Sequence, residues 1–228
     1  MLCSAGSIGP PKADCGAGVV STVAPQPRLY RGLWSQLSHD VYISIKNMPT
    51  LRINKQSQNI PHFVTLTTIE WIDIFTKPEY FEVIEQSLQF CRKYKRLKVY
   101  EYVIMMNHIH LIISTPEQNN LPQVLSDFKK HTTKKLWELL EKDNRKYIKN
   151  ILQNSYNRKK GYVNQIWQRE NYPEPIYTEK FLMTKIQYIW MNPVKKGYVL
   201  KPEDWLHSSA RKWVLGNVDG FELDKREY

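Results

Sequence analysis

The chain has 228 residues, 42% of them hydrophobic, and a formal net charge of +11. That apolar content is ample for a packed core and excludes disorder throughout, while the absence of any apolar run of about 18 residues excludes a membrane-spanning helix. So basic a chain favours a polyanionic partner, most often nucleic acid.

The N-terminal part differs in composition from the rest. Gly, Pro, Ser and Ala crowd its first half without a periodic pattern, so residues 1–47 are predicted to be a disordered extension and residues 48–228 a single domain. The cysteines, Cys3, Cys15 and Cys91, include no Cys-x-x-Cys pair. They provide neither a disulfide framework nor a zinc ribbon, and they favour a cytoplasmic location.

The rest of the chain alternates between strand and helix periodicities. In chain order, the patterns predict a strand at 62–68, a helix at 77–94, strands at 97–106 and 108–114, a helix at 121–140, a polar loop at 143–164 and a helix at 179–191. This order favours an α+β fold, a ferredoxin-like antiparallel sheet with helices packed on one face.

The most specific pattern is a pair of histidines, His108 and His110, in an apolar run rich in β-branched residues. Side chains alternate along a strand, so both histidines share one face while Ile109, Leu111 and Ile113 line the other. Two neighbouring imidazoles form half of a metal site. The alternative is a half-buried strand whose histidines bind nothing.

The last predicted helix carries a second chemical pair. Tyr188 and Asn192 are spaced i, i+4 and therefore face the same way, one turn apart. The amide oxygen of Asn192 is a candidate metal ligand, and the phenolic oxygen of Tyr188 is a candidate nucleophile toward phosphorus. A tyrosine packed on the sheet with a solvated hydroxyl is the alternative. Pro193 is expected to end the helix, which weakens the spacing argument for Asn192.

Two sequence blocks together resemble the single-tyrosine HUH transposases. Residues 103–112 are similar to the His-hydrophobe-His strand of that family, and residues 188–199 to the Tyr-Ile-x-x-Asn-Pro-Val-(Arg/Lys)-x-Gly block of its catalytic helix. Residues 166–170 and 204–209 resemble two further blocks of an insertion-sequence-200-like branch, the REP-associated tyrosine transposases. The resemblance covers about residues 60–213, in the order of the family.

The resemblance implies a ferredoxin-like domain that binds single-stranded DNA hairpins and cleaves beside them. It makes His108 and His110 metal ligands, with Asn192 as the third, and Tyr188 the nucleophile that forms a 5′-phosphotyrosine. Mg²⁺ or Mn²⁺ is the expected metal, and two imidazoles suit Mn²⁺ better. A homodimer is compatible with the family, as is a monomer.

Basic residues gather in three clusters, one of them at residues 92–98. The other two are the predicted DNA-binding residues: Lys129, Lys130, Lys134, Lys135, Arg158, Lys159 and Lys160. Lysine and arginine side chains on an exposed face supply phosphate contacts. Tyr156, Tyr162 and Trp167 are predicted to stack on unpaired bases nearby.

The sequence therefore favours a metal-dependent DNA strand transferase that cleaves and rejoins single-stranded DNA. One alternative is a domesticated hairpin-binding protein that moves no DNA. Another is a metal-dependent hydrolase that activates water and survives the loss of Tyr188. A purely structural role for the histidines predicts that divalent metal affects no activity.

Overall fold

The computed structural model describes residues 59–116, 120–155, 164–171, 173–216 and 221–225. The extension predicted at residues 1–47 lies outside these ranges and stays a prediction. The elements are β1 (His62–Thr67), η2 (Ile69–Trp71), α3 (Pro78–Lys95), β2 (Lys98–Ile104), β3 (His108–Ser114), α4 (Leu121–Lys142), α5 (Lys146–Ser155), β4 (Glu174–Pro175), α6 (Glu179–Lys195), η4 (Pro202–Asp204) and α7 (Ser209–Leu215). Within the described ranges, no helix is long and apolar enough to cross a membrane.

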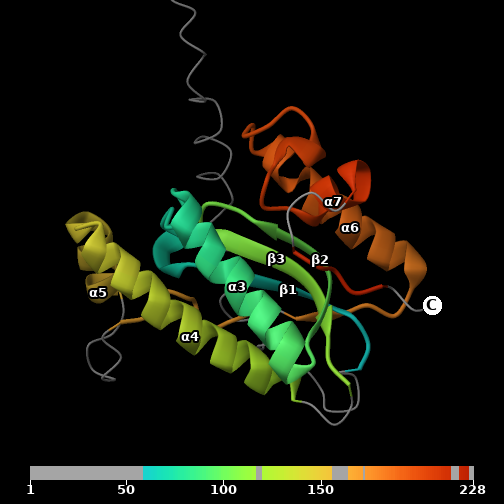
Figure 1. Ribbon diagram of the computed structural model, residues 1–228, viewed down its shortest axis with the longest axis horizontal. Helices are drawn as coiled ribbons and strands as arrows, with labels where there is room; N and C mark the ends of the chain where they lie inside the picture. Colours follow the sequence, from blue (N-terminus) through green and yellow to red (C-terminus); the bar gives the residue numbers. More distant parts are fainter. Residues whose placement is uncertain (1–58, 117–119, 156–163, 172, 217–220, 226–228) are drawn as a thin grey trace, which may run out of the picture. The chain divides into compact units, whose positions relative to one another are not determined.

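A four-stranded antiparallel sheet with the order β2-β3-β1-β4 forms the centre of the domain (Figure 1). The predicted α+β class and antiparallel sheet are confirmed. β3 is buried along its whole length between β1 and β2. In this register Thr65 and Val103 lie opposite His110, one on each neighbouring strand. The histidine strand is therefore held rigidly from both sides.

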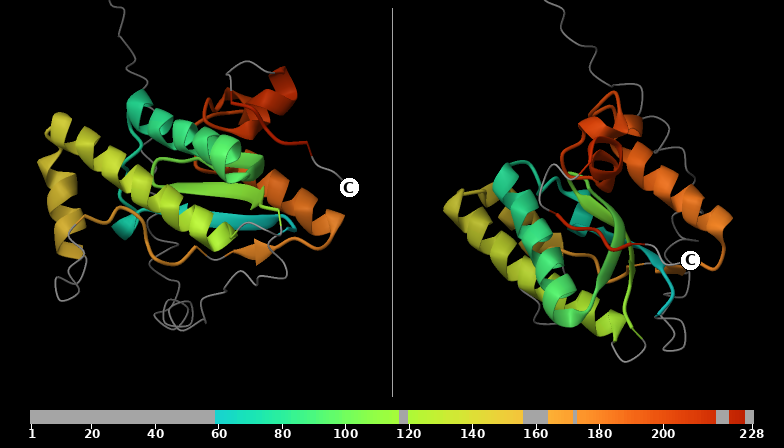
Figure 2. Two further views of the ribbon diagram at one scale, coloured as in Figure 1. Left: turned by 60° about the horizontal axis from the view of Figure 1, so that its bottom comes forward. Right: turned by 45° about the vertical axis from the view of Figure 1, so that its right-hand side comes forward.

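The two faces of the sheet are covered by different helices, as both views in Figure 2 show. Ile109, Leu111 and Ile113 of β3 belong to the core that the sheet forms with α3 and α4. Ile112 points the other way, into a second core that α6 completes. The structure thus corrects the predicted packing in one respect, because the helices are divided between both faces. The sheet carries apolar side chains on each face, so each face needs a cover.

The segment predicted to be a loop at residues 143–164 contains a helix, α5. Ile148 and Leu152 lie one turn apart and are both buried. A stripe this short is easily masked by the polar and basic residues around it, so the loop prediction is wrong for this part of the segment.

Pro193 does not end α6, which continues to Lys195. Gly197 ends the helix instead, with φ of 73°, a left-handed conformation that glycine adopts without strain. The N–H of Tyr198 then donates to the carbonyl oxygen of Pro193 at 3.0 Å. Asn192 therefore keeps helical geometry, and its one-turn spacing from Tyr188 holds.

A buried carboxylate fixes α6 to the edge of the sheet. Glu101 of β2 is fully buried and accepts hydrogen bonds from Trp190 Nε1 at 2.9 Å and Ser209 Oγ at 2.5 Å. These three residues come from β2, α6 and the start of α7, so the network sets the position of α6 against the sheet.

Candidate functional site

The two histidines lie side by side on the face of the sheet that α6 covers. His108 and His110 are both buried, and the centroids of their rings are 4.7 Å apart. The two-residue period of β3 places them on this face together. The predicted juxtaposition of the imidazoles is therefore present.

Hydrogen bonds orient the His108 ring. The amide nitrogen of Asn107 donates to Trp71 O at 3.0 Å and Asp73 Oδ1 at 2.7 Å, so its oxygen faces the imidazole. His108 Nδ1 lies 2.7 Å from that oxygen and must donate to it, which leaves Nε2 as the atom with a free lone pair.

His110 is oriented by a hydroxyl and leaves one nitrogen without a partner. Its Nδ1 lies 2.9 Å from Thr65 Oγ1. Its Nε2 is buried and has no hydrogen-bond partner among the described residues. A buried imidazole nitrogen without a partner is costly unless a ligand binds there.

Burial keeps both imidazoles neutral. It lowers the pKa of His108 to about 4, an effect that the charge of Lys196 increases and a hydrogen bond with Asn192 opposes. The pKa of His110 is lowered well below its ordinary value by burial, by His108 and by Lys185. Neutral imidazole is the form that binds metals, so both side chains are in the ligating state at neutral pH.

The nucleophile candidate of α6 lies against the histidines. The rings of Tyr188 and His110 have centroids 5.0 Å apart, and Tyr188 keeps 40% of its surface exposed. Burial raises the pKa of Tyr188, a hydrogen bond from Asn192 lowers it, and the charge of Glu174 raises it again. Asn192 is buried, and its side chain affects the pKa of both His108 and Tyr188. The predicted histidine, asparagine and tyrosine residues therefore form one contiguous group.

These side chains fit a divalent metal ion. The neutral imidazoles, the unpartnered Nε2 of His110 and the amide oxygen of Asn192 form a donor set that suits Mn²⁺. In the part of the chain that the structure describes, no group of three or more His, Cys, Asp or Glu side chains is placed to hold a metal. The candidate centre therefore depends on Asn192 as its third protein ligand.

Three lysines around this group were not singled out from the sequence. Lys185 Nζ pairs with Glu174 Oε1 at 2.9 Å, and Lys195 Nζ lies 5.9 Å from the centroid of the Tyr188 ring. The charge of Lys196 acts on His108. Helical spacing from Tyr188 along α6 could have found all three, because they lie about one or two turns away from it.

The predicted phosphate contacts of α4 divide into two groups. Lys130, Lys134 and Lys135 are exposed, and Lys135 also pairs with Glu138 at 3.0 Å. Lys129 is half-buried, and burial lowers its pKa to about 8.

The ammonium group of Lys129 is occupied within the chain. It donates to Gln168 O at 2.5 Å, Arg169 O at 3.2 Å and Asn171 Oδ1 at 2.7 Å. The prediction that Lys129 contacts DNA is therefore corrected, because this side chain fastens residues 168–171 to α4.

The other predicted DNA contacts lie mainly beyond the described ranges. This applies to Arg158, Lys159, Lys160, Tyr156 and Tyr162. Trp167 is described and buried, and its Nε1 donates to Thr132 Oγ1 at 2.9 Å. Trp167 is thus a core residue, and the prediction that it stacks on bases is wrong.

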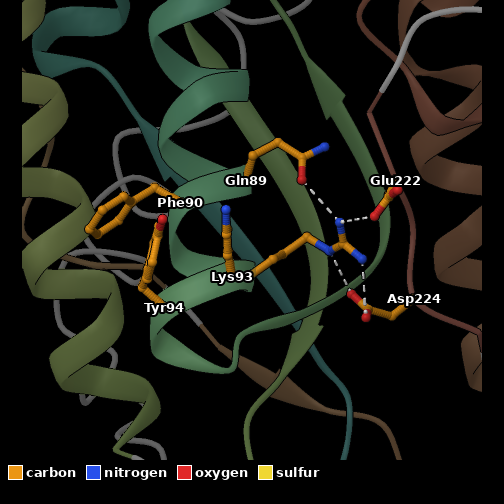
Figure 3. Close-up of a pocket in the computed structure, with 7 residues that line it drawn as sticks. Gln89, Phe90, Lys93, Tyr94, Glu222 and Asp224 are labelled. Carbon is orange, nitrogen blue, oxygen red and sulfur yellow. Dashed lines mark hydrogen bonds and ion pairs between the residues drawn. The ribbon is translucent and has the colours of Figure 1, made fainter.

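Two members of the basic cluster at residues 92–98, Arg92 and Lys95, are paired within the chain. Arg92 bonds Asp224 at 2.8 and 3.2 Å and lies 3.6 Å from Glu222, and Lys95 bonds Asp127 at 2.5 Å. A hollow of about 470 Å³ lies between α3 and the C-terminal segment. Figure 3 shows Glu222 and Asp224 of that segment together with Lys93 and Tyr94 of α3 around it. No candidate site residue lines this hollow, and its acidic side chains do not favour a polyanion.

Comparisons with known proteins show which family the chain resembles. The family model described as Transposase IS200 like matches residues 55–172, which include both histidines and end before α6. A curated protein of Haemophilus influenzae, classed as a REP-associated tyrosine transposase, is 33% identical over 116 residues, which are 50% of this chain. The chain spans 60% of the length of that relative.

A solved structure, that of a REP-associated tyrosine transposase bound to a REP hairpin, has a similar fold. Its TM-score is 0.55 at 19% sequence identity, and the superposition covers 79% of this chain and 99% of that one. At this identity the likeness shows the fold alone.

Proposed function

The chain belongs to the IS200-like transposase family, and from this premise we propose that it cleaves and rejoins single-stranded DNA beside hairpins. Tyr188 is the nucleophile in this proposal. The observation that carries it is the position of Tyr188 against the histidine strand, because its ring centroid lies 5.0 Å from that of His110 and the buried Asn192 side chain affects the pKa of both His108 and Tyr188. A tyrosine packed only for stability needs no such link to a pair of neutral, buried imidazoles.

The proposed reaction conserves the energy of the broken bond. The phenolic oxygen of Tyr188 forms a bond to the scissile phosphorus, its proton is lost, and the bond from phosphorus to the 3′ oxygen breaks. The leaving oxygen takes up a proton and becomes a free 3′-hydroxyl, while the 5′ end stays on the tyrosine. Attack by a 3′-hydroxyl on this phosphotyrosine then forms a phosphodiester and breaks the bond between phosphorus and the Tyr188 oxygen, which takes up the proton that the hydroxyl loses.

The protein's own groups prepare this attack. Since burial raises the pKa of Tyr188, the phenol is protonated at neutral pH, and the hydrogen bond from Asn192 favours the phenolate that forms. Lys195 and Lys196 are exposed at the end of α6 and would bind the phosphates that flank the scissile one. His108, His110 and Asn192 would hold Mg²⁺ or Mn²⁺, which would polarise the phosphate and stabilise charge on its oxygens.

A denaturing gel tests the proposal. Labelled single-stranded DNA with hairpins from beside the gene is incubated with the protein and either Mn²⁺ or EDTA. Wild type is expected to give a metal-dependent covalent adduct that Tyr188→Phe does not form. Tyr177→Phe, which changes an exposed tyrosine just before α6, is the matched control and is expected to keep the adduct.

Two results would contradict the proposal. Cleavage that persists in Tyr188→Phe would favour a hydrolase that activates water. Tight hairpin binding without cleavage in any divalent metal would favour a domesticated binding protein.

A further inference from the structure

A strained turn lies next to the histidines, between β1 and α3. Glu70 and Trp71 are consecutive and have φ of 53° and 54°, in the left-handed region that non-glycine residues rarely adopt. Such conformations persist where the surrounding structure enforces them, and they concentrate at functional sites. The turn therefore has a candidate role beyond connecting two elements.

The turn is fastened to the residue that orients His108. Asn107 donates to the carbonyl oxygen of Trp71 at 3.0 Å while its amide oxygen faces His108 Nδ1 at 2.7 Å. Thr68 Oγ1 lies 2.9 Å from both Ile72 O and Asn107 O. The backbone of Trp71 and the ring of His108 are thus held by a single side chain.

The indole of Trp71 is presented to solvent at the edge of the candidate site. It is 59% exposed, and its ring centroid lies 5.8 Å from that of His108 at an interplanar angle of 65°. A tryptophan that served the core would be buried, as Trp167 is. Because the rings of Trp71 and His108 meet edge to face rather than stacked, much of the indole surface remains open to a planar ligand.

We propose that Trp71 forms a nucleobase subsite, on which an unpaired base next to the scissile phosphate stacks. The inference rests on the proposed function, because it places the DNA backbone at His108 and Tyr188. Aromatic side chains bind unpaired bases by stacking without needing a particular sequence. Asn107 fixes the backbone of Trp71 and the contact with His108 restrains the indole before DNA arrives, so binding loses less conformational freedom.

A fluorescence experiment without bond cleavage tests the subsite. Hairpin DNA carries 2-aminopurine, one position at a time, in the unpaired nucleotides flanking the hairpin, and is titrated with the Tyr188→Phe protein in EDTA. Stacking quenches the emission of this base. Quenching is expected at one or two adjacent positions, and Trp71→Ala in the same background is expected to abolish it there and weaken binding about 5- to 150-fold.

Three further variants separate stacking from stability. Trp71→Phe keeps an aromatic ring and is expected to retain most of the quenching. Trp71→Gly relieves the backbone strain, so it is expected to lose the quenching while unfolding at the same or a higher urea concentration. Trp213→Ala, which removes an exposed tryptophan of α7, is the matched control and is expected to behave like the parent.

The outcomes distinguish this inference from the proposed function. Binding is followed separately by the fluorescence anisotropy of a dye at the end of the DNA. If Trp71→Ala binds the DNA and shows the same quenching as its parent at every position, the subsite is overturned. Absence of a covalent adduct in wild type would overturn the proposed function, whereas the quenching result, obtained without cleavage, would stand.

Discussion

At the scale of single residues, the candidate centre depends on side chains that orient its two histidine rings. Thr65 and Asn107 each contact the Nδ1 atom of a histidine, so the Nε2 atoms are left for a ligand. Partners of this kind fix the ring orientation and raise the basicity of the ligand. They are not ligands themselves, and their removal leaves the imidazoles in place.

Replacing Thr65 with valine removes the hydroxyl beside His110 but keeps the shape of the side chain. The variant is expected to bind Mn²⁺ about 10- to 100-fold more weakly, the usual effect of losing a partner of a metal-bound histidine. Isothermal titration calorimetry measures this, with Thr184→Val on the exposed face of α6 as the control. An unchanged affinity in Thr65→Val would show that this hydrogen bond does not support a metal ligand.

The buried histidines also make the stability of the metal-free protein depend on pH. Because the folded pKa of His108 is about 4, below its unfolded value, the unfolded chain binds more protons as the pH falls through about 6.5. The stabilising contribution of neutral His108 is therefore complete above about pH 6.5 and is lost as the pH falls toward the folded pKa of about 4. Because the pKa of His110 is lowered in the same direction, urea unfolding in EDTA is expected to give a free energy lower by at least about 2 kcal/mol at pH 5 than at pH 7.5.

His108→Gln provides the comparison for this titration, because glutamine does not ionise. It is expected to show a smaller loss between the two pH values than wild type. Equal losses would mean that the charge state of His108 does not limit folding.

At the scale of elements, α6 is the part whose position decides the chemistry. It carries Tyr188 and Asn192 and is joined to β2 through Trp190 and the buried Glu101. A β-bulge between Val99 and Glu101 turns this carboxylate toward α6. The fit of the tyrosine against the histidines thus depends on a contact outside the site.

Trp190→Phe tests this contact, since it removes one donor from a buried carboxylate and keeps an aromatic ring. The free energy of unfolding is expected to fall by about 1–3 kcal/mol, because the buried carboxylate loses one of its donors while Ser209 remains, and cleavage is expected to slow. Urea unfolding and the gel assay measure both effects, with Trp213→Phe as the control. Full stability and full activity in Trp190→Phe would show that Glu101 does not position α6.

Substitution of an exposed lysine of α4 and substitution of its half-buried Lys129 are expected to affect DNA binding differently. Lys134→Ala removes an exposed charge, so the slope of log affinity for single-stranded DNA against log salt is expected to decrease in magnitude by about 0.7. Lys129→Met removes three hydrogen bonds to residues 168–171, so it is expected to lower stability and leave the slope unchanged. A slope that changes in Lys129→Met but not in Lys134→Ala would reverse this assignment.

At the scale of the whole molecule, the local parts of the site could be predicted from the sequence. The alternation of a strand places His108 and His110 on one face, and one helical turn separates Tyr188 from Asn192. Both rules act within one element, so no knowledge of packing is needed. The structure brings the two pairs together as the resemblance to the HUH transposases implied.

What depends on contacts between distant segments could not be predicted. Both faces of the sheet are apolar, so the pattern does not say that α6 covers the histidine face. Lys129 is charged and follows the polar side of its helix, yet residues 168–171 bury it. The backbone of Trp71 takes its strained form through Asn107, a residue on another segment.

The most direct test of the central claim is to find the residue that carries the DNA. The protein is incubated with the hairpin DNA and Mn²⁺, the adduct is digested with nuclease and protease, and mass spectrometry locates the remaining nucleotide. The account predicts a 5′-linked phosphotyrosine at Tyr188. A nucleotide on any other side chain, or cleavage that leaves none on the protein, would contradict it.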